Sequence, residues 1–90
     1  MVERNAAVKN RLGIHARPAA LLVKAAATFK CEILLVKDGL EINGKSIMGV
    51  MMLAAEQGST ILVRTEGEDE EAAADKVVDV IEGVFENGTA

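Results

Sequence analysis

The sequence predicts an α+β fold, a sandwich in which helices pack on a sheet. Segments with an apolar residue at every second position alternate along the chain with segments of helical spacing, as in mixed α+β domains. The 90 residues suffice for one hydrophobic core, so we expect residues 1–90 to form a single domain. Half of the residues are hydrophobic but only 2% are aromatic, so the core must be built from aliphatic side chains and Ala.

The first third of the chain predicts a strand, a loop and a helix. Residues 2–9 alternate loosely and predict a strand, whereas residues 10–14 contain Gly13 and predict a loop. Residues 16–28 have a helical composition, and Pro18 falls in the first turn, where its missing N–H costs little. The residues spaced to form the buried face of this helix are Ala19, Leu22, Val23, Ala26 and Phe29.

The middle of the chain predicts a hairpin followed by a short helix. Residues 31–37 are β-branched and aliphatic, which indicates a second strand. The dipeptide Asp38-Gly39 is typical of a two-residue hairpin turn, so residues 40–43 should return as a third strand. Ser46 is suited to cap a short helix that runs to about residue 55.

The last third predicts a strand and a long helix. Residues 60–66 alternate and indicate a fourth strand, and Gly67 precedes a helix that we expect to reach about residue 86. The apolar stripe of this helix is Ala73, Val77, Val80, Ile81 and Val84. The acidic residues 68–71 fall at its start, where carboxylates complement the helix dipole, which we favour over a functional acidic patch. The order of elements is thus β-α-β-β-α-β-α.

Charge and cysteine content exclude several classes of protein. The net charge is -4 and no block of Lys and Arg is present, so we expect no nucleic-acid partner. No apolar run approaches the roughly 20 residues of a membrane span, and the first residues do not resemble a secretion signal. The single cysteine, Cys31, cannot form an internal disulfide, which favours a reducing compartment. A cytoplasmic location without membrane insertion follows.

One His and one Cys also leave too few ligands for common metal and cofactor sites. A structural zinc site needs about four nitrogen or sulfur ligands. No glycine loop of the kinds that bind nucleotides is present. We therefore expect no metal and no cofactor, and any chemistry should involve His15.

His15 lies at the boundary between a glycine loop and a predicted helix start. Free backbone N–H groups and a partial positive charge make such a start a natural seat for an anion. Arg17 adds a planar cation suited to phosphate oxygens, and a neutral imidazole is a competent nucleophile, a form that the helix start favours. Composition alone favours an ordinary helix start, with His15 as its cap and Arg17 in solvent.

Two segments of the sequence decide between these interpretations. Residues 10–20, Asn-Arg-Leu-Gly-Ile-His-Ala-Arg-Pro-Ala-Ala, resemble the active-site segment of the HPr family, the histidine-containing phosphocarriers of the sugar phosphotransferase system. Residues 43–50, Asn-Gly-Lys-Ser-Ile-Met-Gly-Val, resemble the regulatory serine region of the same family. The resemblance continues through residues 57–59 and 66–70, so it covers nearly the whole chain.

The resemblance implies a fold and a phosphoryl-transfer role. The fold would be an open-faced sandwich, with a four-stranded antiparallel sheet and three helices on one face. Enzyme I, charged from phosphoenolpyruvate, would phosphorylate the Nδ1 atom of His15, and enzyme IIA of a sugar transporter would receive the group. Arg17 would stabilise the phosphoryl charge, the amides of Ala16 and Arg17 would meet its oxygens, and Pro18 would fix the helix start. The chain would carry a phosphoryl group as a covalent phosphohistidine without being an enzyme.

The resemblance also implies that Ser46 is phosphorylated by an HPr kinase/phosphorylase. As a plain N-cap, a serine here would stabilise the helix by about 1 kcal/mol, and a cap and a phosphorylation site are compatible. A regulatory HPr paralogue, of a nitrogen branch or of catabolite control and acting through protein–protein contacts, is the alternative function. An enzyme with a Cys31–His15 dyad is a third class, which no hydrolase motif supports.

The predicted short helix is apolar nearly all round, more than one buried face requires. We assign Val50 and Leu53 to the core. Ile47, Met48 and Met51 then form an exposed surface beside His15, named here the docking patch, where adaptable Met side chains suit several partners. The alternative is that all the apolar residues of this helix are buried.

Leu34, Val36 and Leu62 alternate onto the sheet face opposite the helices. In the family pattern that face is open to water, so these side chains should make it more hydrophobic and more prone to association than is usual in the family. We therefore expect weak self-association at high protein concentration.

Overall fold

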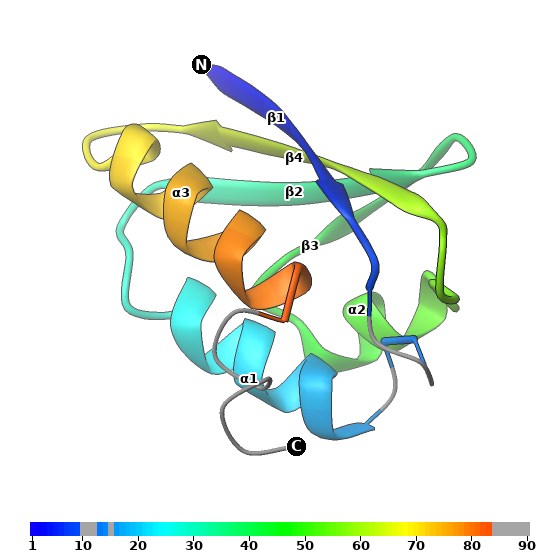
Figure 1. The fold of residues 1–90 in the computed structure, drawn as a ribbon. Helices are drawn as coiled ribbons and strands as arrows, with labels where there is room; N and C mark the ends of the chain where they lie inside the picture. Colours follow the sequence, from blue (N-terminus) through cyan, green and yellow to red (C-terminus); the bar gives the residue numbers. More distant parts are fainter. Residues whose placement is uncertain (10–12, 15, 84–90) are drawn as a thin grey trace.

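The computed structural model describes residues 1–9, 13–14 and 16–83. Its elements in chain order are β1 (Val2–Ala7), α1 (Ala16–Ala26), β2 (Glu32–Lys37), β3 (Leu40–Asn43), α2 (Ile47–Met52), β4 (Thr60–Glu66) and α3 (Glu70–Ile81). The predicted order β-α-β-β-α-β-α is confirmed. All three helices lie on one side of a single sheet (Figure 1), which makes the fold an open-faced sandwich.

The four strands form an antiparallel sheet in the order β1-β4-β2-β3. The β2–β3 hairpin pairs Lys37 with Leu40 across the two turn residues Asp38 and Gly39. Their φ angles of 52° and 81° are both positive, as the favoured hairpin turn requires and as the Asp-Gly pair predicted. β4 lies in the centre, where Val63 pairs with Arg4 on one side and Leu35 on the other.

The core lies between the sheet and the helices and is almost wholly aliphatic. On α1 the predicted stripe residues Ala19, Leu22 and Ala26 are fully buried, whereas Val23 of α1 and Phe29, which follows this helix, are partly buried and pack against the core. On α3 the predicted stripe is confirmed for Ala73, Val77, Val80 and Ile81, and Val84 lies outside the described residues. Thr65 is the one polar side chain buried in the described part of the chain, and its hydroxyl donates to the Glu70 carbonyl at 2.8 Å.

Two predicted element ends are wrong near β1 and α1. β1 ends at Ala7 instead of residue 9, because Val8 leaves the ladder and exchanges backbone hydrogen bonds with Gly58 and Ser59. α1 ends at Ala26 instead of residue 28, since the amides of Thr28 and Phe29 bond three residues back instead of four.

Three further ends are set by contacts that sequence patterns do not reveal. α2 stops at Met52 instead of residue 55, because Ala54 takes a positive φ of 50°. β2 begins at Glu32 and α3 at Glu70, later than predicted, because the Asp69 carboxylate accepts the amides of Lys30 and Cys31, both at 2.9 Å. α3 ends at Ile81 instead of about residue 86, because the chain leaves the helix at its C-cap Glu82 and Gly83 takes a positive φ of 80°.

Asp69 therefore joins the start of α3 to the start of β2. The hydrogen bond from the Lys30 amide is the main reason that the pKa of Asp69 lies below its ordinary value. Two further acidic residues, Glu70 and Glu71, occupy the first turn of α3, as the dipole interpretation of the acidic run predicted. The acidic run is thus structural.

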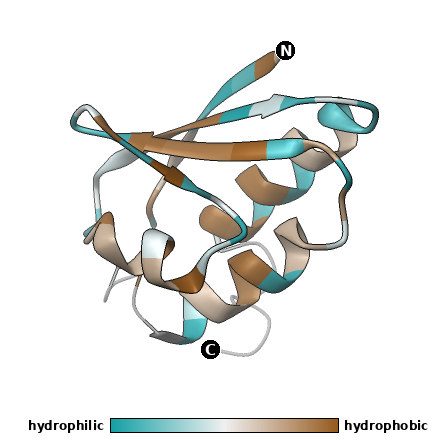
Figure 2. Cartoon of the chain, turned by 180° about the vertical axis from the view of Figure 1, so that it is seen from behind, coloured by the Kyte–Doolittle hydropathy of each residue, from teal (hydrophilic) through white to brown (hydrophobic). Residues whose placement is uncertain are grey.

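The sheet face opposite the helices carries Leu34, Val36 and Leu62, as predicted. Figure 2, which views the molecule from behind, shows β2 as a mostly hydrophobic strand. The three side chains are half-buried instead of fully exposed, since Val36 and Leu62 are register partners and cover each other. Arg64 lies on the same face and pairs with Glu3 at 2.8 Å and Glu41 at 3.8 Å, which adds charge across the sheet.

Candidate functional site

His15 itself lies outside the described residues, but the residues on either side of it define its support. Gly13 has a φ of 73°, and a Cβ there would collide with the Ala55 carbonyl oxygen. The same oxygen accepts a 2.7 Å hydrogen bond from the Ile14 amide. The chain that enters position 15 is therefore fixed to the segment after α2, and only glycine fits at position 13.

α1 begins at Ala16, directly after His15, as predicted. Its first turn contains no acidic residue, so no carboxylate of that turn neutralises the positive end of the helix dipole. Pro18 is buried in this turn, where a missing N–H is tolerated. Arg17 is exposed and has no hydrogen-bond or ion-pair partner among the described residues, so its guanidinium is available for an anion.

Ser46 is the N-cap of α2, which confirms its predicted structural role. Its backbone is extended, with φ -111° and ψ 118°, and its hydroxyl accepts the Gly49 amide at 3.1 Å. The preceding Lys45 extends its ammonium to the Phe29 carbonyl at 2.7 Å. The start of α2 is thereby tied to the chain that follows α1, while its end contacts the loop before His15.

The surface of α2 is exposed where the docking patch was predicted. Ile47, Met48 and Met51 are 44%, 74% and 45% exposed, whereas Val50 and Leu53 are buried in the core. The alternative that all the apolar residues of this helix are buried is wrong, because one face of a six-residue helix cannot take them all.

Two further large apolar side chains are exposed on α2 and on the neighbouring α1. Met52 is 64% exposed on α2, and Leu21 is 39% exposed on α1, which packs beside α2. Leu21 was not singled out from the sequence. The signal was present, since the apolar run around Leu22 exceeds what one buried stripe needs, as in α2.

Cys31 follows the far end of α1, whose 11 residues from Ala16 to Ala26 span about 16 Å. Burial raises the pKa of its thiol to about 11, and a hydrogen bond with the Asp69 carboxylate acts in the same direction. A protonated, buried thiol is a poor nucleophile, and its position argues against a dyad with His15.

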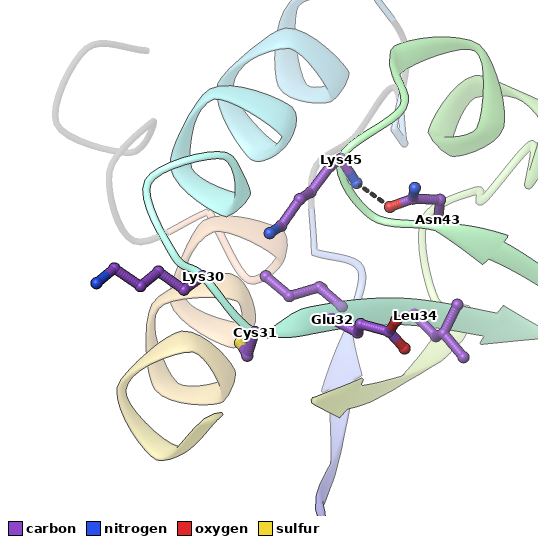
Figure 3. Close-up of a pocket in the computed structure, with 7 residues that line it drawn as sticks. Lys30, Cys31, Glu32, Leu34, Asn43 and Lys45 are labelled. Atoms are coloured by element: carbon purple, nitrogen blue, oxygen red, sulfur yellow. Dashed lines mark hydrogen bonds between the residues drawn. The ribbon is translucent and has the colours of Figure 1, made fainter. Parts of the chain in front are cut away.

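A pocket of about 380 Å³ opens beside Cys31, between the start of β2 and the turn before α2 (Figure 3). Lys30, Glu32, Asn43 and Lys45 contribute its polar lining. The Lys45 amide donates to the Asn43 side chain at 2.8 Å, and its ammonium is already used by Phe29. The pocket therefore lies at the far end of α1 and is separate from the start of that helix.

The described residues contain no group of three or more His, Cys, Asp or Glu side chains that could hold a metal ion. Within the same residues, no helix is long and apolar enough to cross a membrane.

Known proteins are similar to this chain over nearly its whole length. The phosphocarrier protein HPr of Treponema pallidum is 49% identical over 87 residues, which cover 97% of this chain and 94% of the relative. The HPr-like protein Crh of Halalkalibacterium halodurans is 50% identical over 82 residues, 91% of this chain and 98% of the relative.

Solved structures agree in fold. A crystal structure of HPr from Thermoanaerobacter tengcongensis covers 96% of this chain with 97% of its own, at 45% identity and a TM-score of 0.90. A second structure from that organism, described as an HPr dimer, matches at 46% identity and a TM-score of 0.74, covering 94% and 98%.

A family model described as the PTS HPr component phosphorylation site matches residues 2–83. The match includes the start of α1, the cap of α2 and every strand of the sheet. The chain therefore belongs to the HPr family of phosphocarrier proteins.

Proposed function

We propose that the chain accepts a phosphoryl group on Nδ1 of His15 from enzyme I and donates it to enzyme IIA of a sugar transporter, in the cytoplasm. The observation that carries this proposal is the start of α1. α1 begins directly after His15, and its first turn contains no acidic residue. The guanidinium of Arg17 in the same turn is exposed and has no partner among the described residues. That arrangement suits a phosphoryl group, which brings about two negative charges.

Each residue at this helix start has a role in the proposal. The backbone amides of Ala16 and Arg17 have no intrahelical acceptor at the first positions of α1 and can donate to phosphoryl oxygens. The Arg17 guanidinium adds a charge-assisted hydrogen bond. Pro18 fixes the backbone of the first turn without using an N–H.

The direct test is labelling. The chain is incubated with phosphoenolpyruvate and enzyme I, and the modified residue is found by mass mapping before and after mild acid. Acid-labile phosphate on His15 is the expected result. No labelling, or labelling elsewhere, contradicts the proposal.

Arg17→Ala should slow transfer without unfolding the domain. A hydrogen bond to a charged group contributes about 1.5–3 kcal/mol, so the transfer rate should fall by about ten- to 150-fold. Rapid-quench transfer from phosphorylated enzyme I measures this. Arg17→Lys is the matched control, because it keeps the charge but loses the planar guanidinium. Its transfer rate should lie between the rates of wild type and Arg17→Ala. A wild-type rate for Arg17→Ala would leave Arg17 as a solvent-exposed residue without a role.

A second candidate function is that of a regulatory HPr paralogue, which acts mainly through protein contacts after phosphorylation of Ser46 by an HPr kinase/phosphorylase. The similarity to an HPr-like protein Crh favours it. Labelling by that kinase with ATP, together with no labelling by enzyme I, would select this function over phosphoryl transfer.

We also propose weak self-association through the open sheet face, since a similar HPr has been described as a dimer. Leu34, Val36 and Leu62 supply an apolar surface there, which Arg64 limits by adding charge. Sedimentation at millimolar protein should show a dimer fraction that falls in Leu62→Lys. A clean monomer at that concentration contradicts the proposal.

A further inference from the structure

All four methionines of the chain are on the surface, and three of them occupy α2. Met48, Met51 and Met52 are 74%, 45% and 64% exposed, and Met1 is 66% exposed at the start of the chain. Positions 48, 51 and 52 follow helical i, i+3, i+4 spacing, so the three thioethers share one side of the helix. The core contains no methionine.

The cysteine is protected by contrast. Cys31 is 3% exposed, and burial raises the pKa of its thiol to about 11, so at neutral pH it is neither accessible nor a thiolate. Oxidants attack thiolates and exposed thioethers. The accessible sulfur of this protein therefore lies on α2 and at Met1.

We propose that Met48, Met51 and Met52 form an oxidation site for peroxides, and that their conversion to sulfoxides weakens partner docking. The inference rests on the proposed function, because Met48 and Met51 belong to the docking patch. Met52 borders it on the same helix.

The reaction balances with hydrogen peroxide as the oxidant. A thioether lone pair attacks one peroxide oxygen, an S–O bond forms and the O–O bond breaks. The second oxygen takes up the proton of the first and leaves as water. The sulfur loses two electrons, which the peroxide gains. Methionine sulfoxide reductases reverse the change.

The product changes the surface and spares the fold. Each sulfoxide places a polar oxygen where the thioether made an apolar contact. A partner that covers the docking patch must desolvate this oxygen, which costs binding free energy. The inner side of α2 is held by Val50, which is fully buried and keeps its contacts. Oxidation should thus lower affinity while the unfolding midpoint stays near its starting value.

The test treats the full chain with hydrogen peroxide, maps the sulfoxides by mass spectrometry, and measures affinity for enzyme I by calorimetry before and after treatment. Met48 and Met52 should oxidise before the less exposed Met51, and Cys31 should remain a thiol. Affinity should fall by about tenfold, which equals about 1.4 kcal/mol.

A triple variant, Met48→Leu, Met51→Leu and Met52→Leu, provides the control. Its Met1 still oxidises, so it experiences the same chemistry at a distant site. Its ratio of affinities before and after treatment should stay near one, whatever its own starting affinity.

Two outcomes overturn the inference alone: oxidised wild type that binds as tightly as untreated wild type, or an equal loss in the triple variant. If untreated wild type does not bind enzyme I or become labelled, the proposed function fails and the inference fails with it. The untreated sample therefore separates the two failures.

Discussion

Replacing His15 with Ala is expected to abolish phosphorylation of the chain by phosphoenolpyruvate and enzyme I. His15 is the only histidine in the sequence, so the variant has no imidazole that could take the group. The acid-labile label should drop to background in an assay that labels wild type fully. The sequence places His15 between a glycine loop and a helix start, where a side chain contributes little to a core, so the free energy of unfolding should change by no more than about 0.5 kcal/mol.

A matched surface variant controls for nonspecific loss. Asp79→Asn changes an exposed residue of α3 and should be labelled like wild type. If His15→Ala still acquires acid-labile phosphate from enzyme I, the proposed phosphoryl acceptor is wrong.

Ser46→Asp is expected to weaken binding of enzyme I by about tenfold or more, because a desolvated or opposed charge costs at least 1.4 kcal/mol. The new carboxylate would stand at the N-cap of α2, at the rim of the docking patch formed by Ile47, Met48 and Met51. Phosphorylation of Ser46, with a charge of about -1.5 to -2, should act in the same direction more strongly. Calorimetric titration with enzyme I measures both effects.

The fold should survive this substitution. An aspartate caps a helix about as well as a serine and complements the positive end of the dipole, so the unfolding midpoint should stay close to wild type. Ser46→Asn is the matched control, since it has the same shape and capping ability without the charge. Equal affinity of enzyme I for wild type, Ser46→Asp and Ser46→Asn would leave Ser46 as a helix cap only.

The sequence predicted correctly the ends of helices and strands that depend on residues close by in the chain. The Asp38-Gly39 turn fixed the β2–β3 hairpin, and the hydroxyl of Ser46 marked the start of α2. The limits that were missed depend on distant contacts. Asp69 resembles a helix cap but makes no capping hydrogen bond, and its carboxylate binds amides 38 and 39 residues away.

The candidate site was predictable to a similar degree. Pro18 lies in the first turn of α1 and the docking patch is exposed on α2, as the sequence indicated, because each follows from its position in a helix. The link between Ile14 and Ala55 was not foreseen. It depends on the positive φ of Ala54, which a residue without the usual glycine signal adopts only when the surrounding fold demands it.

That link between Ile14 and Ala55 also bears on the entropy of recognition. The Ile14 amide and the close approach at Gly13 hold the entry to α1 against the exit from α2, and Lys45 ties the opposite end of α2 to Phe29. A partner that covers both helices meets a surface whose two halves are already fixed relative to each other. Association then costs little conformational entropy, so a partner that covers both helices gains affinity from a surface that is already ordered.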